Sequence, residues 1–175
     1  YVGVTTYTGN GGTQSINVGF KPDFVWIKDR STTYDHRLVD SVRGSTRVLF
    51  SNQTNTEQVD SYGTVGSFTS NGFTLRLGTT IVGAEGANAN GDAHVAWCWK
   101  AGGNSNTFNI DDVGYDTASA AGLTAGTITP TGASVNTKSG FSIITHSGSG
   151  STGTISHGLQ KAPAFIITKI RSSGV

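Results

Sequence analysis

Apolar and polar residues alternate in several short runs along the chain, with the period of a half-buried β-strand. In the clearest run, Ala93–Lys100, Trp97 and Trp99 point to one face while Ala96 and Cys98 point to the other. Small side chains on the second face predict close packing against another layer. Shorter runs of strand character lie at Val4–Thr8, Gln14–Val18, Phe24–Ile27, Arg37–Ser41, Arg47–Ser51, Thr64–Thr69, Gly72–Leu77 and Phe141–Thr145.

Many short strands joined by tight turns indicate an all-β fold, an antiparallel β-sandwich, with barrel closure as the alternative. The composition agrees, because 25 of the 175 residues are Gly and only 13% are charged. In Phe24–Ile27 both faces are apolar, which predicts a central strand that is buried on both sides.

One stretch of the chain occurs twice, as residues 7–31 and 146–172. The matching positions are Gly9/Gly148, Gly11/Gly150, Thr13/Thr152, Ile16/Ile155, Gly19/Gly158, Pro22/Pro163, Phe24/Phe165, Lys28/Lys169, Arg30/Arg171 and Ser31/Ser172. Such self-similarity indicates a duplicated structural unit. Each copy is expected to form a strand, a Gly-rich turn, a second strand, a loop with Pro and a third strand.

The repeat divides the chain into a first β-sandwich unit at 1–103, a connecting segment at 104–139 and a partial second unit at 140–175. The chain starts on Tyr1 and has no Met. We therefore expect it to be a segment of a longer protein, such as an array of these units. The alternative is that the partial copy completes its sheet with another chain.

Composition narrows the function classes. The net charge of +1 comes without a basic stripe, so nucleic-acid binding is not expected. No apolar run approaches the length needed to span a membrane, and no signal peptide is visible. The single Cys98 excludes an intrachain disulfide and fits synthesis in a reducing cytoplasm.

Few residues suggest chemistry, and each has a structural interpretation that we favour. Asp35, His36 and Asp40 lie near Ser31 and Ser41, but a hydrolytic triad is defined by geometry, and polar loop contacts are the expected role. The sequence Gly148–Gly153 matches a dinucleotide fingerprint yet leads into a β-rich stretch, which predicts a hairpin turn. We predict no catalytic residue and no cofactor.

Two groups of residues could bind ligands. Asn88, Asn90 and Asp92 offer oxygen ligands for Ca²⁺ but lack the acidic cluster of a tight site, so no metal is predicted. Among loop aromatics, Tyr34 and Tyr62 are the candidates for ligand contact. A surface ion-pair group is expected from Arg37, Arg43, Arg47 and Asp40.

The three tryptophans admit two interpretations. Trp26, Trp97 and Trp99 could form a platform on which sugar rings stack. Packing in the core is favoured, because Trp26 is replaced by Ile167 in the second copy.

A series of segments in order resembles the repeated domain of virion proteins from tailed phages, notably marine and cyanobacterial ones. These segments are Gly19–Ser31, His36–Gly44, Leu49–Asn52, Asn71–Leu75, Asn90–Gly102 and Gly140–Ile144. The resemblance covers nearly the whole chain. It implies a concanavalin-like jelly-roll sandwich within long tail-fibre-like or appendage chains, with a structural or host-adhesion role and no catalytic residue to transfer.

These considerations lead to a first hypothesis: a non-enzymatic structural protein of a phage virion, made in the host cytoplasm and displayed on the particle surface. It would self-assemble with its own copies or with other virion proteins and contribute to host attachment. A lectin-like module of a surface adhesin, binding a host-surface glycan, is the alternative. A glycan-cleaving enzyme would need paired carboxylates facing one groove, and no convincing pair stands out.

Overall fold

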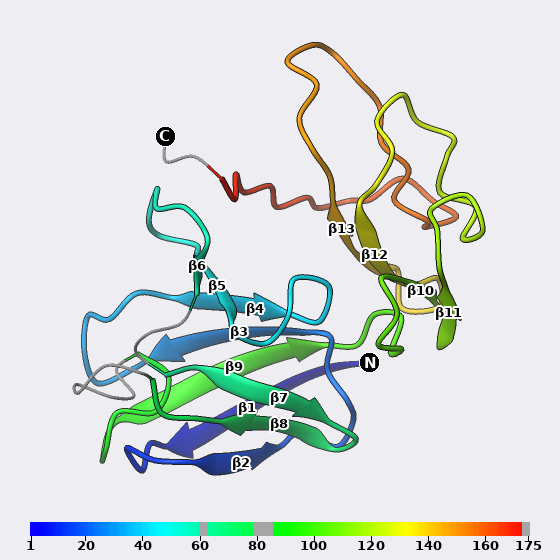
Figure 1. The fold of residues 1–175 in the computed structure, drawn as a ribbon. Helices are drawn as coiled ribbons and strands as arrows, with labels where there is room; N and C mark the ends of the chain where they lie inside the picture. The colour runs from blue at the N-terminus through cyan, green and yellow to red at the C-terminus, as the bar shows by residue number, and fades with distance from the viewer. Residues whose placement is uncertain (60–62, 79–85, 173–175) are drawn as a thin grey trace. The chain divides into compact units, whose positions relative to one another are not determined.

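The computed structural model describes residues 1–59, 63–78 and 86–172. The chain forms two compact units. Unit 1 comprises Tyr1–Trp99 together with Ile167–Val175, and unit 2 comprises Lys100–Ile166. All regular secondary structure in the described residues is β-strand (Figure 1), which confirms the all-β prediction.

Unit 1 is a sandwich of two antiparallel sheets. The larger sheet has the order β1-β9-β3-β4-β5-β6, with strands Val2–Thr8, Ala93–Trp99, Phe24–Asp29, Arg37–Asp40, Arg47–Phe50 and Gln58–Val59. The smaller sheet has the order β2-β8-β7, with strands Gln14–Asn17, Gly72–Leu75 and Val65–Thr69. The β-sandwich expected from the alternating pattern is therefore observed. The jelly-roll topology stays a prediction.

Strand β9 lies between β1 and β3 in the larger sheet. It pairs with both in antiparallel register, with Val2 opposite Trp99 on one side and Phe24 opposite Trp99 on the other. The small side chains of Ala96 and Cys98 are fully buried, as the alternation predicts. They let the second sheet approach this strand closely.

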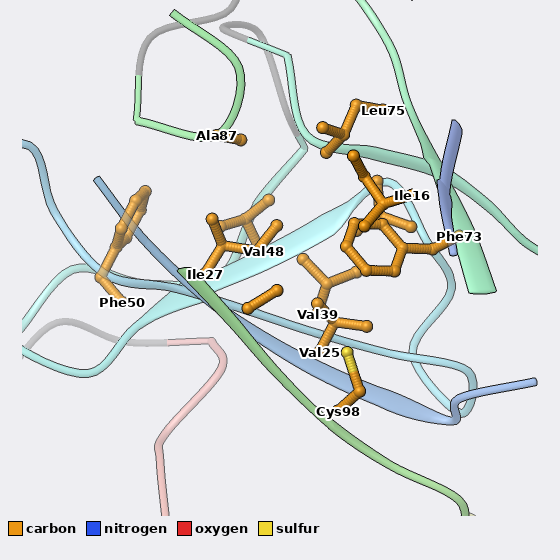
Figure 2. Packing of buried hydrophobic residues seen from close by; sticks show 12 residues of the cluster. Ile16, Val25, Ile27, Val39, Val48, Phe50, Phe73, Leu75, Ala87 and Cys98 are labelled. Atoms are coloured by element: carbon orange, nitrogen blue, oxygen red, sulfur yellow. The ribbon is translucent and has the colours of Figure 1, made fainter. Parts of the chain in front are cut away.

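The core of unit 1 fills the space between the two sheets (Figure 2). The larger sheet contributes the alternate residues that face inward, including Val25, Ile27 and Val39. The smaller sheet contributes Phe73 and Leu75, both fully buried. One apolar face of each sheet is thus removed from water, which is the main source of stability in a sandwich.

Unit 2 contains a four-stranded sheet of order β11-β10-β12-β13. Its strands are Val113–Tyr115, Phe108–Ile110, Gly132–Asn136 and Phe141–Thr145. Strands β10 and β12 are parallel, whereas the other pairs are antiparallel. The predicted connecting segment at 104–139 thus supplies three of the four strands.

The sequence repeat is partly preserved in the structure. Strands β1 and β13 begin at equivalent positions, Val2 and Phe141. The equivalent glycines Gly11 and Gly150, which follow these strands, both have positive φ, at 67° and 71°, a conformation that favours Gly. The second copy therefore reproduces the first strand and the following turn geometry.

The rest of the second copy differs from the prediction. Its second strand is reduced to one bridge between Ile128 and Ile155, and residues 165–170 form no strand. In unit 1 the equivalent strands β2 and β3 are held by β8, β9 and β4. No strand of that kind borders these segments in the described chain, so their backbone groups have no ladder to join.

Candidate functional site

Four aromatic residues form a row on the face of the larger sheet that points away from the core. They come from neighbouring strands β3 and β9 and alternate with the core residues of those strands: Phe24, Trp26, Trp97 and Trp99. The ring centroids of Trp26 and Trp97 are 6.0 Å apart, and those of Phe24 and Trp99 are 5.4 Å apart. All four are half-buried. We call them the outer aromatic row.

The outer aromatic row continues onto the edge strand β1. Val2 lies opposite Trp99 and Val4 opposite Trp97, and these valines are 63% and 60% exposed. The prediction that the tryptophans belong to the core was wrong. The small residues between them fill the core side, so the large rings occupy the other face.

Polar groups border the row at the β3–β4 loop. The Trp26 indole N–H donates to Nδ1 of His36 at 3.1 Å. Burial, followed by the charge of Lys28, lowers the pKa of His36, which favours the neutral ring that can accept this bond. Tyr34 lies in the same loop and is 37% exposed, whereas Tyr62 lies outside the described residues.

The acidic and histidine residues of this region do not converge on one another. The Asp35 carboxylate accepts hydrogen bonds from the side-chain amides of Asn52 and Gln53. Asp40 instead pairs with Arg43. Each group is thus held in a structural contact, as the sequence analysis favoured.

A polar cluster is enclosed within unit 1. The Asp29 carboxylate and Nε2 of His94 are 3.4 Å apart, and both side chains are fully buried. Burial would raise the pKa of Asp29, but the N–H groups of Ser31 and Thr32, together with His94, hold it below its usual range. The ring of Tyr7 stacks on His94. The enclosed cluster thus connects β1, β3 and β9, and its two ionisable side chains, Asp29 and His94, are not accessible to a substrate.

The loop that contains the candidate Ca²⁺ ligands, Asn88, Asn90 and Asp92, is held by hydrogen bonds within the protein. The Asn88 amide donates to Oδ1 of Asn10 and to the carbonyl of Gly12, and Asn88 is 1% exposed. The described residues contain no group of three or more His, Cys, Asp or Glu side chains placed to hold a metal. Burial raises the pKa of the Cys98 thiol to about 12, so this side chain stays a neutral thiol.

A buried ion cluster joins the end of the chain to unit 1. Arg43 contacts Asp40 and lies 3.1 Å from Glu57, and these three side chains are at most 7% exposed. Arg171 approaches Glu57 through two nitrogens, each at 2.8 Å. Burial raises the pKa of Glu57, but hydrogen bonds from Arg171 and Arg43 outweigh this and hold it below its usual range. The predicted ion pair of Arg43 and Asp40 is present, but it is buried.

Just before Arg171, the segment Phe165–Ile170 exposes an unusual amount of apolar surface. Phe165 is 78% exposed, and the next three large apolar residues are exposed by 68%, 50% and 53%: Ile166, Ile167 and Ile170. The equivalent residues of β3, Phe24 and Val25, are half-buried and fully buried. The unpaired segment Phe165–Ile170 therefore has the sequence of a central strand and the environment of a surface loop.

Comparison with known proteins places the chain in a family. The model of the domain of unknown function DUF7483 matches residues 1–175, and the chain belongs to that family. No curated protein and no solved structure matches it. Among the described residues, no helix is long and apolar enough to cross a membrane.

Proposed function

We propose that the chain is a non-enzymatic structural module of a phage virion, part of a tail fibre or appendage that assembles through its β-sheets and contributes to host attachment. The observation that carries this proposal is the unpaired segment Phe165–Ile170, whose four large apolar side chains are exposed. Exposed apolar stretches of strand character favour association with another sheet. The resemblance to virion repeats supplies the phage context.

The arrangement of polar groups supports a role without catalysis. The Asp29–His94 pair is fully buried, and the carboxylates of Asp40 and Glu57 are occupied by Arg43. These ionisable groups connect strands to one another. They stabilise a scaffold and leave the exposed apolar surfaces as the parts available to partners.

Self-association of the 1–175 chain is the expected result. Light scattering across a concentration series should give a mass that rises above that of the monomer, because burying Phe165 and its neighbours removes apolar surface from water. Phe165→Asp should shift this rise to higher concentration. Val59→Asp is the matched control, since Val59 is 59% exposed on a different strand. A monomer at every concentration would contradict assembly.

A second function, lectin-like carbohydrate binding on a surface adhesin, is favoured by the outer aromatic row. Half-buried tryptophans on an outer sheet face can stack against sugar rings, as aromatic side chains do in many binding sites. The sequence analysis considered the same role, a platform on which sugar rings stack, for the three tryptophans. In the structure Trp97 lies at the centre of the outer aromatic row, between Val4 and Trp26.

The glycan prediction can be tested by titrating host-surface oligosaccharides while tryptophan fluorescence is monitored. Saturable binding should weaken at least tenfold in Trp97→Ala. Tyr34→Ala probes the neighbouring loop, and Tyr115→Ala in unit 2 serves as the control. Equal affinities for Trp97→Ala and the unchanged chain would exclude this face as the binding site.

A further inference from the structure

The outer aromatic row is bonded to a titratable group at Trp26. The indole N–H donates to Nδ1 of His36 at 3.1 Å, and the two ring centroids are 6.0 Å apart in an edge-on arrangement of 61°. His36 itself is half-buried. An imidazole nitrogen accepts a hydrogen bond only while it carries no proton. The contact therefore requires the form of His36 in which Nδ1 is unprotonated.

The β3–β4 loop holds His36 in place through contacts that do not involve its ring. The backbone N–H of His36 donates to Oδ1 of Asn52 at 3.0 Å, and the Asn52 amide in turn donates to the Asp35 carboxylate at 2.8 Å. The Lys28 ammonium donates to the carbonyl of Tyr34 at 3.1 Å. Because these bonds are independent of the imidazole, protonation of the ring acts first on its contact with Trp26.

The groups around the imidazole keep it neutral near pH 7. Burial and the charge of Lys28 on β3 lower the pKa of His36, and the charge of Asp35 in the same loop opposes them. Asn52 contributes a neutral amide. In acid, Nδ1 gains a proton and becomes a donor, so it faces the indole N–H of Trp26 with a second N–H. Two donors cannot bond to each other, and the indole N–H loses its acceptor.

The orientation of Trp26 matters to the whole row. Trp26 lies opposite Trp97 of β9 on one side and opposite Leu38 of β4 on the other. The rings of Trp26 and Trp97 meet edge-on, with an interplanar angle of 65°. A ring that is already held in the orientation needed for binding costs less entropy when a ligand arrives. The bond to His36 supplies this constraint at one end of the tryptophan pair.

We infer that His36 is a positioning residue of the outer aromatic row: its neutral ring holds Trp26 in the orientation that a sugar ring meets, and its protonation releases Trp26. This inference rests on the carbohydrate-binding function proposed for the row and adds its regulation. The row binds its ligand near neutral pH and loses affinity in acid.

The contact can be tested in the 1–175 chain without any ligand. Nuclear magnetic resonance follows the indole N–H signal of Trp26, assigned by Trp26→Phe, and the ring signals of His36 as the pH is lowered. The two should move together. His36→Asn places a carbonyl oxygen near the position of Nδ1 and does not titrate, so in this variant the Trp26 signal should stay constant. His157→Asn is the matched control in unit 2, which contains no tryptophan, and should leave the titration unchanged.

Two results from this titration would overturn the inference. One is a Trp26 signal that stays constant while the His36 ring titrates. The other is a His36 ring that does not titrate at any pH at which circular dichroism shows the chain to be folded.

Oligosaccharide titrations at neutral pH and below the midpoint of His36 test the regulation. Affinity should fall in acid by about fivefold, the scale of one lost hydrogen bond, and should stay constant in His36→Asn. Equal affinity at both pH values retains the carbohydrate function and overturns its regulation, as does an acid loss of the same size in His36→Asn. Absence of binding at every pH contradicts the carbohydrate function, and the Trp26 signal then decides separately whether His36 positions that ring.

Discussion

Phe73→Ala is expected to lower the free energy of unfolding of unit 1 by about 3–5 kcal/mol. The ring of Phe73 on β8 is fully buried and packs between the two sheets (Figure 2), so truncation removes apolar contacts and leaves a cavity. Urea unfolding monitored by tryptophan fluorescence measures this loss. The signal reports on unit 1, because all three tryptophans of the chain belong to it: Trp26, Trp97 and Trp99.

Truncation of an exposed apolar side chain in the same unit is the control. Val59 of unit 1 is 59% exposed, so Val59→Ala should change the free energy of unfolding by less than about 0.5 kcal/mol. A loss below about 1 kcal/mol for Phe73→Ala would contradict its place at the centre of the core.

Arg43→Met is expected to destabilise unit 1 by about 3 kcal/mol at neutral pH, because it leaves the buried carboxylates of Asp40 and Glu57 without their shared cation. In the unchanged chain the pKa of Glu57 is lowered on folding. Its contribution to stability is therefore present above its unfolded pKa and lost as the pH falls through the folded value.

The pH dependence distinguishes a lost ion pair from lost packing. The unchanged chain loses the Glu57 contribution as the pH falls, whereas Arg43→Met already lacks the Arg43–Glu57 contact, so the difference between the two chains should shrink between pH 7 and about pH 3, as measured by urea unfolding. Arg47→Met is the control, since Arg47 is 46% exposed and 3.8 Å from Glu57, and its loss should stay below about 1 kcal/mol. A loss that is the same at both pH values would point to packing instead.

Strands rich in β-branched and aromatic residues were predictable from the sequence. Ala93–Trp99, Phe24–Asp29 and the hairpin around Ser70 form as the pattern indicates, because one face of each must be buried against a sheet. Strands β10 and β11 were missed, since each has three residues, too few for a period to emerge. Strand β11 pairs with β10 across the turn at Asp111 and Asp112, and β10 in addition pairs with Gly132–Asn136, which is distant in sequence.

The sequence identified the aromatic residues of the outer aromatic row, but not the face of the sheet on which they lie. The sequence identifies the three tryptophans and their shared faces, but it does not state which face of β9 meets the core. The small side chains of Ala96 and Cys98 were the available signal, because the tightly packed face of a central strand favours small residues. The unpaired segment Phe165–Ile170 is the opposite case, because its sequence predicts a strand and the structure contains none there. A strand forms only where a neighbouring strand is available for pairing, and the sequence of the segment alone does not show this.

The antiparallel hairpin of β12 and β13 also determines how unit 2 responds to tension. Gly132 lies opposite Thr145, so the two ends of the hairpin that lead to the rest of the chain leave from the same side. A pulling force along the polypeptide would open this hairpin by unzipping its backbone bonds one pair at a time, from Gly132 toward Asn136. Unzipping needs less force than shearing a whole strand, so this hairpin would yield at low force and lengthen the chain.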